Sequence, residues 1–309
     1  MTTTAQAGAH TVPAAGPTVL GHFEPGTPEW HAARANGIGG SEIAAVLGLS
    51  PYESRFSLWH RKQGLIGAVE ESPQMRWGKK HEPTICAEFA ELHPEWIVHA
   101  SATYAAADRP WQIANPDRLL YLPGSEEPFA LLEAKTAYDD EGWGEEGTDQ
   151  IPVWYRAQCQ WYLDVLGLTV CHVAVLIGLS DYREYIVEYD PADVQKARDA
   201  AAEFMRTLAA GERPDIDGHS ATYQAIRDIP DGLDDVDVEI ETVLRDRFHA
   251  AQDAFWLAED EITACKGLLL DAIDTGRRAV CERDRVATRT VRDGKTYQLL
   301  PARTRRNAR

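Results

Sequence analysis

The chain has 309 residues, enough to bury a full core in one large domain or two modest ones. Hydrophobic residues make up 44% and charged residues 26%, as in ordinary water-soluble globular proteins, which disfavours a fibrous or disordered chain. No run approaches the roughly 18 consecutive apolar residues of a membrane helix, so we expect no membrane partner. The formal net charge of −18 argues against broad, non-specific adhesion to nucleic acid.

The charge is distributed unevenly along the chain. Residues 276–309 contain 11 Lys and Arg against 3 acidic residues, a local balance of +8, so the rest of the chain carries −26. A basic segment of this kind is usually a solvated surface, but it can also contact phosphate groups. Both interpretations stay open.

The cysteines are scattered, odd in number and never arranged as CxxC, which disfavours a zinc site, an iron–sulfur site or a disulfide framework. A reducing cytoplasm is therefore the expected setting. Residues 1–20 lack the basic start and continuous apolar stretch of a secretory signal. Because they are rich in Ala, Thr and Pro, we expect them to form a disordered leader.

After this leader, helices alternate with a short meander of strands up to about residue 230, a pattern that indicates an α/β fold. The first part predicts a helix, a glycine turn, a short helix, a loop and a further helix. The expected later elements are strands within 96–104, 111–122 and 129–137, a helix over 151–167, strands over 169–178 and 183–190, and a helix over 191–210.

A further helix is expected before the strands, ending near Leu92. Its apolar residues Ile85 and Phe89 are spaced for one face, and Glu82 falls on that same face. Since proline is tolerated only in the first turn of a helix, Pro83 places the expected start near Lys80.

Residues 231–309 have a different sequence pattern, in which a long predicted helix is followed by a basic segment. Apolar residues recur at steps of three and four over 240–269, as in a coiled-coil seam. This face can pack on its own domain or join subunits, and the sequence does not decide between the two. Asp293-Gly294 predicts a small hairpin in the last segment.

Two acidic residues and a lysine interrupt apolar strand-like segments: Asp117 in "ANPDRLL", and Glu133 and Lys135 in "LLEAKT". A buried carboxylate without a partner is costly, so such residues pair with cations or bind metal. Glu133 and Lys135 project from one face of a strand, and Asp117 can reach that face across a hairpin. This cluster suits Mg²⁺ or Mn²⁺, with the lysine orienting or deprotonating water or stabilising a phosphate. An ion pair that merely joins two strands is the open alternative.

Further polar residues favour the metal site. Glu82 faces inward on its helix, so its carboxylate also needs a cation or a metal ion as a partner. Gln158 lies on the inward side of its helix, where it can hydrogen-bond a ligand or a backbone group. "GIGGSE" at 37–42 precedes a helix for which Ser41 is a good N-cap, and backbone amides there can bind an anion. Arg34 can add a bidentate phosphate contact.

These segments resemble the signature of the PD-(D/E)xK nucleases, and specifically the phage-type exonuclease and YqaJ-like recombinase family. The resemblance rests on five stretches in order, over about residues 30–190. They are "W-x₃-R-x₂-GIGGSE-x₂-AVLG-x-SPY", "WGKKHEP", "ANPDRLL", "LLEAKT" and "IPVWYRAQCQWYLDVLG".

The resemblance implies a restriction-endonuclease-like core over 21–230, with a central mixed sheet flanked by helices and a helical extension over 231–309. By resemblance, the metal ligands are Glu82, Asp117, Glu133 and the Ala134 carbonyl, the catalytic lysine is Lys135, and Gln158 completes the active site. Arg34 and Ser41 would hold a 5′-phosphate, with Tyr155 nearby.

The resemblance also implies an activity. This is Mg²⁺-dependent hydrolysis of the 5′ strand at double-stranded DNA ends, releasing mononucleotides and leaving 3′ overhangs for a single-strand annealing recombination protein. It further implies a phage- or prophage-encoded protein of the bacterial cytoplasm, and a ring-shaped trimer. The alternatives are a structure-specific endonuclease of the same fold and a non-catalytic adaptor that binds DNA ends.

Overall fold

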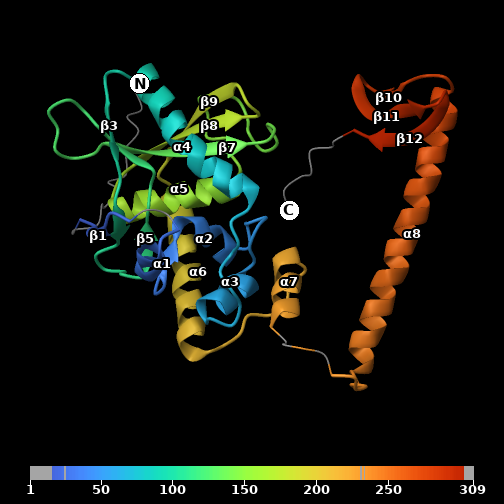
Figure 1. Ribbon diagram of the computed structural model, residues 1–309, viewed down its shortest axis with the longest axis horizontal. Coiled ribbons are helices and arrows are strands. Elements are labelled where there is room, and N and C mark those ends of the chain that lie inside the picture. Colours follow the sequence, from blue (N-terminus) through green and yellow to red (C-terminus); the bar gives the residue numbers. More distant parts are fainter. Residues whose placement is uncertain (1–15, 24–25, 230–231, 233, 303–309) are drawn as a thin grey trace, which may run out of the picture. The chain divides into compact units, whose positions relative to one another are not determined.

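The computed structural model describes residues 16–23, 26–229, 232 and 234–302 (Figure 1). It divides into two compact units, Met1–Asp231 (unit 1) and Gly232–Arg309 (unit 2). No helix within the described ranges is both long enough and apolar enough to cross a membrane.

The main sheet of unit 1 has five strands in the order β3-β6-β7-β8-β9. The β7–β8 pair is parallel and the other neighbours are antiparallel, so the sheet is mixed, as expected. The strands are β3 (Ile97–Ala100), β6 (Arg118–Tyr121), β7 (Ala130–Ala137), β8 (Val170–Ile177) and β9 (Asp181–Glu188).

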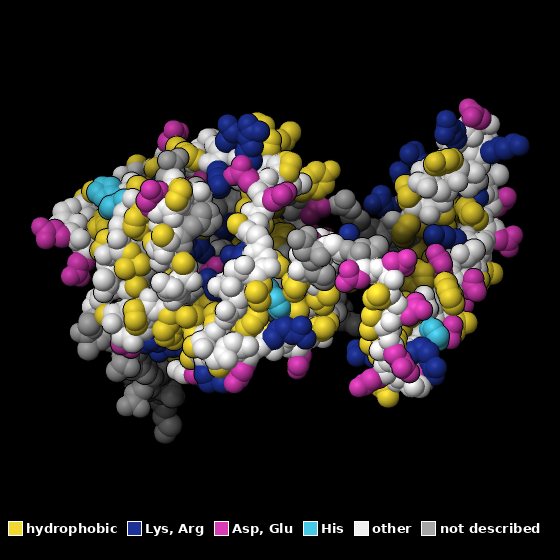
Figure 2. Space-filling model, turned by 60° about the horizontal axis from the view of Figure 1, so that its bottom comes forward, with side chains coloured by type: hydrophobic (Ala, Val, Ile, Leu, Met, Phe, Trp, Pro, Cys, Tyr) yellow, Lys and Arg dark blue, Asp and Glu magenta, His cyan; other side chains and the backbone are white. Residues whose placement is uncertain are grey.

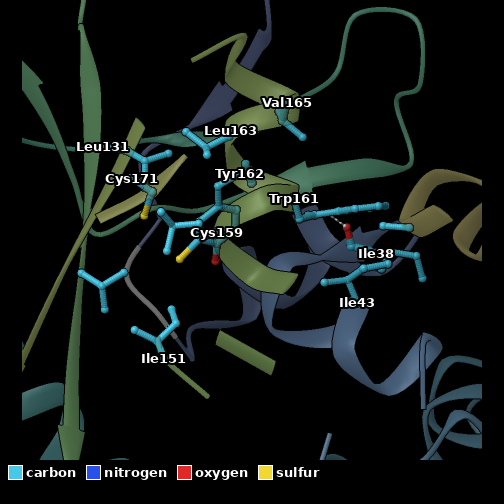
Figure 3. Packing of buried hydrophobic residues seen from close by; sticks show 14 of the residues in the cluster. Ile38, Ile43, Leu131, Ile151, Cys159, Trp161, Tyr162, Leu163, Val165 and Cys171 are labelled. Atoms are coloured by element: carbon cyan, nitrogen blue, oxygen red, sulfur yellow. Dashed lines mark hydrogen bonds between the residues drawn. The ribbon is translucent and has the colours of Figure 1, made fainter. Parts of the chain in front are cut away.

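Helices cover both faces of this sheet, because side chains alternate between the faces along each strand. On β7, Leu132 packs with Ile85 and Phe89 of α4 (Pro73–Leu92), whereas Leu131 belongs to the cluster that contains α5 (Val153–Leu166). Figure 3 shows that second cluster, which is the larger core. The indole of Trp161 on α5 donates to the Ile38 carbonyl at 3.1 Å.

A second, four-stranded sheet lies in the order β1-β4-β5-β2. It takes part of each of the first two predicted β segments, which each split between the two sheets. Pro116 separates β5 from β6, and proline cannot donate to a strand ladder. The strands are β1 (Thr18–Gly21), β2 (Ile38–Gly39), β4 (Thr103–Ala105) and β5 (Gln112–Ala114).

Strand β1 begins inside the segment expected to be a disordered leader and pairs with β4. The first 15 residues of that segment lie outside the described residues. Four of the remaining helices of unit 1 follow the predicted order, and the helix expected over 191–210 is confirmed. These four are α1 (Pro28–Arg34), α2 (Gly40–Val46), α3 (Arg55–Lys62) and α6 (Pro191–Ala210). A fifth helix, α7 (Ser220–Asp228), was not predicted.

The predicted start of α4 is wrong, because the helix begins at Pro73 and contains Pro83 in its interior. The hydroxyl of Ser72 caps it by accepting from the Met75 amide, and Pro73 suits the first turn. Pro83 removes one helical hydrogen bond, and burial of Ile85, Cys86 and Phe89 against the sheet offsets that loss.

The turn before α2 needs two glycines for lack of space. A Cβ on Gly39 would lie 2.1 Å from Nη2 of Arg34, and a Cβ on Gly40 would lie 2.3 Å from Cε1 of Tyr162. Both neighbouring side chains are buried, so neither can move away cheaply. The turn can therefore pack directly on α5.

Gly40→Ala should lower the free energy of unfolding by about 1–3 kcal/mol, because the added methyl overpacks Tyr162. Urea denaturation of the full chain measures this. Gly218→Ala is the control, since nothing lies within 4 Å of a Cβ there. Equal stability of the two variants would contradict the close packing of α2 on α5.

Unit 2 consists of α8 (Thr242–Ile273) and a sheet in the order β10-β11-β12, with β10 (Arg278–Cys281), β11 (Asp284–Arg292) and β12 (Lys295–Pro301). The predicted hairpin is confirmed: Asp293 and Gly294 join β11 to β12 with positive φ angles of 52° and 73°. Ala279, Ala287 and Leu299 of the sheet pack on the end of α8.

Candidate active site

Asp117, Glu133 and Lys135 lie together where the start of β6 runs beside β7. Nζ of Lys135 donates to Oε1 of Glu133 at 2.6 Å, as the two residues share one face of β7. Oδ2 of Asp117 accepts from the backbone amide of Ala134 at 2.8 Å. The two acidic residues thus converge on one strand, as the spacing of the two segments predicts.

Helix α5 supplies a second layer over these groups. Nε2 of Gln158 donates to Oε1 of Glu133 at 2.5 Å and to the Tyr162 hydroxyl at 3.1 Å. Nζ of Lys135 also donates to Oε1 of Gln158, at 3.3 Å, and lies 4.8 Å from the centroid of the Tyr155 ring. The amide of Gln158 therefore fixes both the carboxylate and the ammonium group.

Burial raises the pKa of Asp117 well above its usual range, and the negative charge of Glu133 raises it further. Burial also raises the pKa of Glu133, although the charge of Lys135 opposes this rise. The pKa of Lys135 is raised, because the attraction of both carboxylates outweighs its desolvation. The lysine is therefore an ammonium ion, and its single positive charge acts on both buried Glu133 and half-buried Asp117.

The cluster fits a divalent cation. Within the described residues, Oε2 of Glu133 is a buried oxygen with no hydrogen-bond partner, which leaves one carboxylate lone-pair site for a ligand. No three His, Cys, Asp or Glu side chains of the described chain form a ready metal site. Mg²⁺, however, usually needs only one or two carboxylates and completes its shell with water. Asp117 and Glu133 satisfy that requirement.

Glu82 lies at the margin of the cluster. Its Oε1 accepts from Nη1 of Arg118 at 3.0 Å, and the side chain of Glu82 is 28% exposed. Its negative charge still raises the pKa of both Asp117 and Glu133, so it lies within their electrostatic range. Arg118 thus pairs with Glu82 at the margin of the cluster, away from the Glu133–Lys135 pair.

Arg34 and Ser41 are also brought together, with Nη2 of Arg34 donating to Oγ of Ser41 at 3.0 Å. The prediction that Ser41 caps α2 is wrong. Gly39 occupies the N-cap position, and Oε2 of Glu42 accepts from its backbone amide at 2.8 Å. Glycine has no side chain to accept from the first-turn amides, and Glu42 instead satisfies the backbone amide of the N-cap itself, which is one half of a capping box.

Sequence reasoning missed Glu42, the buried anchor of a charged cluster. Its carboxylate lies 3.1 Å from Nζ of Lys62, 3.5 Å from Nη2 of Arg61 and 3.8 Å from Nη2 of Arg34. Burial raises the pKa of Glu42, but these three cations and the Gly39 amide lower it by more, so the net shift is downward. The available signal was an acidic residue inside the apolar helix "SEIAAVLG".

The two clusters meet at Tyr162. Its hydroxyl accepts from Gln158 of the carboxylate cluster, while its ring lies against Gly40 beside Ser41. Burial raises the pKa of Tyr162, and the charges of both Glu133 and Arg34 act on it. The carboxylates and the Arg34–Ser41 pair therefore belong to one contiguous site.

Glu42→Gln should lower the free energy of unfolding by about 3 kcal/mol at neutral pH, because Lys62 and Arg34 lose their buried counter-charge and Arg61 keeps only Glu53. The lowered pKa makes this stabilisation complete above the unfolded pKa of about 4.3 and lost as pH falls through the lower folded pKa. The difference between variant and wild type should therefore shrink in acid. Urea denaturation across pH checks this, and a pH-independent difference would contradict it.

Residues 29–169 match the family model described as the YqaJ-like viral recombinase domain. This match covers a little under half of the chain and includes every residue of the two clusters described above.

The chain is 31% identical over 205 residues to the uncharacterized protein YqaJ of Bacillus subtilis, covering 64% of this chain and 62% of that protein. Protein D345L of African swine fever virus is 30% identical over 129 residues, 40% of this chain and 36% of its own length. The chain thus spans less than two thirds of these relatives.

Among solved structures, an alkaline exonuclease (LHK-Exo) of Laribacter hongkongensis is similar, with a TM-score of 0.50 and 20% identity. The similarity covers 60% of this chain and 94% of that one. Unit 1 therefore has the restriction-endonuclease-like fold expected of a PD-(D/E)xK core, a mixed sheet between helices.

Proposed function

We propose that this protein is a Mg²⁺-dependent DNA exonuclease of phage-type recombination, which hydrolyses the 5′ strand at duplex ends and leaves 3′ overhangs. The observation that carries the proposal is that buried Glu133 and half-buried Asp117 converge on one strand, close to one ammonium group. The match to the recombinase family model and the fold shared with an alkaline exonuclease support it.

Asp117 and Glu133 would hold the metal ion, with Glu82 and the Ala134 carbonyl as further ligands. When bound, Mg²⁺ (or Mn²⁺) would activate water and neutralise negative charge on the phosphate. Glu82 can join the site only if it leaves Arg118, and Arg118 then becomes available to a DNA phosphate.

The protein's own residues position the reacting groups. Lys135 is held as an ammonium ion and can donate a hydrogen bond to the attacking water or to a phosphate oxygen. Gln158 keeps Glu133 oriented through its amide, and Tyr162 in turn orients Gln158. Tyr155 lies against Lys135 and limits its movement.

Arg34 and Ser41 are the proposed site for the 5′-phosphate of the DNA end. Arg34 is buried at 8% exposure, and it stacks 4.1 Å from the centroid of the Trp30 ring. A guanidinium and a hydroxyl 3.0 Å apart can together bind two phosphate oxygens. Binding of a terminal phosphate by this pair would favour end recognition and hence an exonuclease over an endonuclease of the same fold.

By the same proposal, the protein acts in the bacterial cytoplasm and passes its 3′ overhangs to a single-strand annealing protein. A trimeric ring is the assembly that the family resemblance suggests for unit 1.

Lys135→Ala should reduce mononucleotide release from 5′-phosphorylated linear duplex by about a hundredfold or more. Lys196→Ala is the control, because that lysine is 74% exposed on α6. Cleavage of closed circular DNA would favour the endonuclease. DNA-end binding without any cleavage would favour the non-catalytic adaptor and contradict the enzyme.

Mg²⁺ should raise the melting temperature of the wild type, since a ligand that binds only the folded state stabilises it. Asp117→Asn should abolish this rise. In EDTA the same variant should melt at or above the wild-type temperature, because one half-buried negative charge is removed. Scanning calorimetry measures both, and an equal Mg²⁺ effect in the two proteins would remove Asp117 from the metal site.

Arg34→Lys should lower the preference for 5′-phosphate over 5′-hydroxyl ends about tenfold, because lysine cannot make the bidentate contact. Lysine keeps the positive charge near Glu42, so this variant should stay folded. Competition between the two DNA ends measures the preference, and an unchanged ratio would exclude Arg34 from the phosphate pocket.

A further inference from the structure

Helix α8 carries an exposed apolar stripe that unit 2 itself does not cover. None of its residues is buried within unit 2, and its large apolar side chains on this stripe are 55–63% exposed. Exposed hydrophobic side chains are also evident on the right-hand part of Figure 2, among charged ones. The stripe is made of Leu244, Phe248, Ala251, Phe255, Ala258 and Ile262.

These six residues follow a heptad repeat in which one core position is large and the other mostly small. Phe248, Phe255 and Ile262 are spaced by seven, and Ala251 and Ala258 lie three residues after the phenylalanines. In a parallel pair of helices, equal positions face each other, so phenylalanine meets phenylalanine and alanine meets alanine. In an antiparallel pair, phenylalanine faces alanine in the four inner layers, and Leu244 faces Ile262 in the two end layers.

One antiparallel register also matches the flanking charges. If Phe255 packs on Ala251 of the partner subunit, then Arg245 lies opposite Glu259 of the partner subunit and Arg247 lies opposite Glu261 of the partner subunit. By symmetry this gives four contacts of opposite charge. A shift of one heptad instead places Arg245 opposite Lys266 of the partner subunit.

The ends of α8 fit this register. Beyond Ile262, Leu269, Leu270 and Ile273 pack on the three-stranded sheet of their own unit, while Leu268 stays exposed. The uncovered stripe therefore stops where the favoured register needs it to stop. Leu244 to Ile262 spans about 28 Å, long enough for six core layers.

We infer that α8 forms an antiparallel, two-fold symmetric pair with α8 of a second copy of this chain, centred near Asp253. The charge pattern and the alternation of large and small residues favour a second copy over an unrelated partner. In this register the arginines of one copy meet the glutamates of the other, and the phenylalanines meet the alanines. The pair places the two basic sheets at opposite ends. This inference does not depend on the proposed nuclease activity.

Site-specific cross-linking tests the orientation. In the inferred pair, Ala254 lies beside Ala254 of the partner subunit, whereas the two copies of Cys265 are far apart. A full-length Ala254→Cys chain with Cys265→Ser and Cys281→Ser should form a covalent dimer with a short bismaleimide. A Cys281→Ser chain, which keeps Cys265, should not. Cross-linking through Cys265, or none through position 254, would overturn the inference.

Charge reversal tests the register in the full chain by light scattering over a range of protein concentrations. Arg245→Glu with Arg247→Glu, and separately Glu259→Arg with Glu261→Arg, should each weaken α8-dependent pairing roughly tenfold to a hundredfold. An equal mixture of the two variants should restore it.

The control is Asp253→Lys with Asp260→Lys, since these exposed residues lie on the outer face of α8. It should pair like the wild type. A wild type that never pairs, or equal pairing in all variants, would overturn the inference. Loss of nuclease activity would leave it standing, because neither readout uses DNA.

Discussion

The structure of the site depends on one electrostatic constraint: the buried carboxylate of Glu133 and the half-buried carboxylate of Asp117 lie close to a single ammonium group. Burial raises the pKa of both Asp117 and Glu133, and the single positive charge of Lys135 balances only one carboxylate charge. Such an arrangement costs free energy unless a further positive charge arrives. In the proposed function, a divalent cation would supply that charge.

The surrounding fold holds this constraint in place. The parallel β7–β8 pair and α5 keep Glu133, Lys135 and Gln158 in fixed positions, while the short α2 packs on α5 through Gly40. The second charged cluster, centred on Glu42, has the opposite imbalance, because Arg34, Arg61 and Lys62 surround Glu42 and, among the described residues, only Glu53 adds a second carboxylate. The first cluster therefore has excess negative charge, and the second has excess positive charge beside Arg34.

Much of this site could be predicted from sequence, because helix and strand periods set which residues share a face. Glu133 with Lys135 and the inward position of Gln158 followed from periods of two and of about four. The α4 start and the Ser41 cap were missed, since tertiary burial outweighed the local preference of Pro83 and since Glu42 capped the helix from inside. The split of two predicted strands between two sheets needed long-range pairing that no local pattern contains.

The central claim is that a divalent cation completes the charge balance at Asp117 and Glu133. Crystals grown with Mn²⁺ and measured at its absorption edge would test this most directly. The account predicts an anomalous peak within bonding distance of an Asp117 oxygen and of Oε2 of Glu133, the buried oxygen without a hydrogen-bond partner among the described residues. A fully occupied Mn²⁺ site elsewhere, with Lys135 alone on both carboxylates, would contradict it.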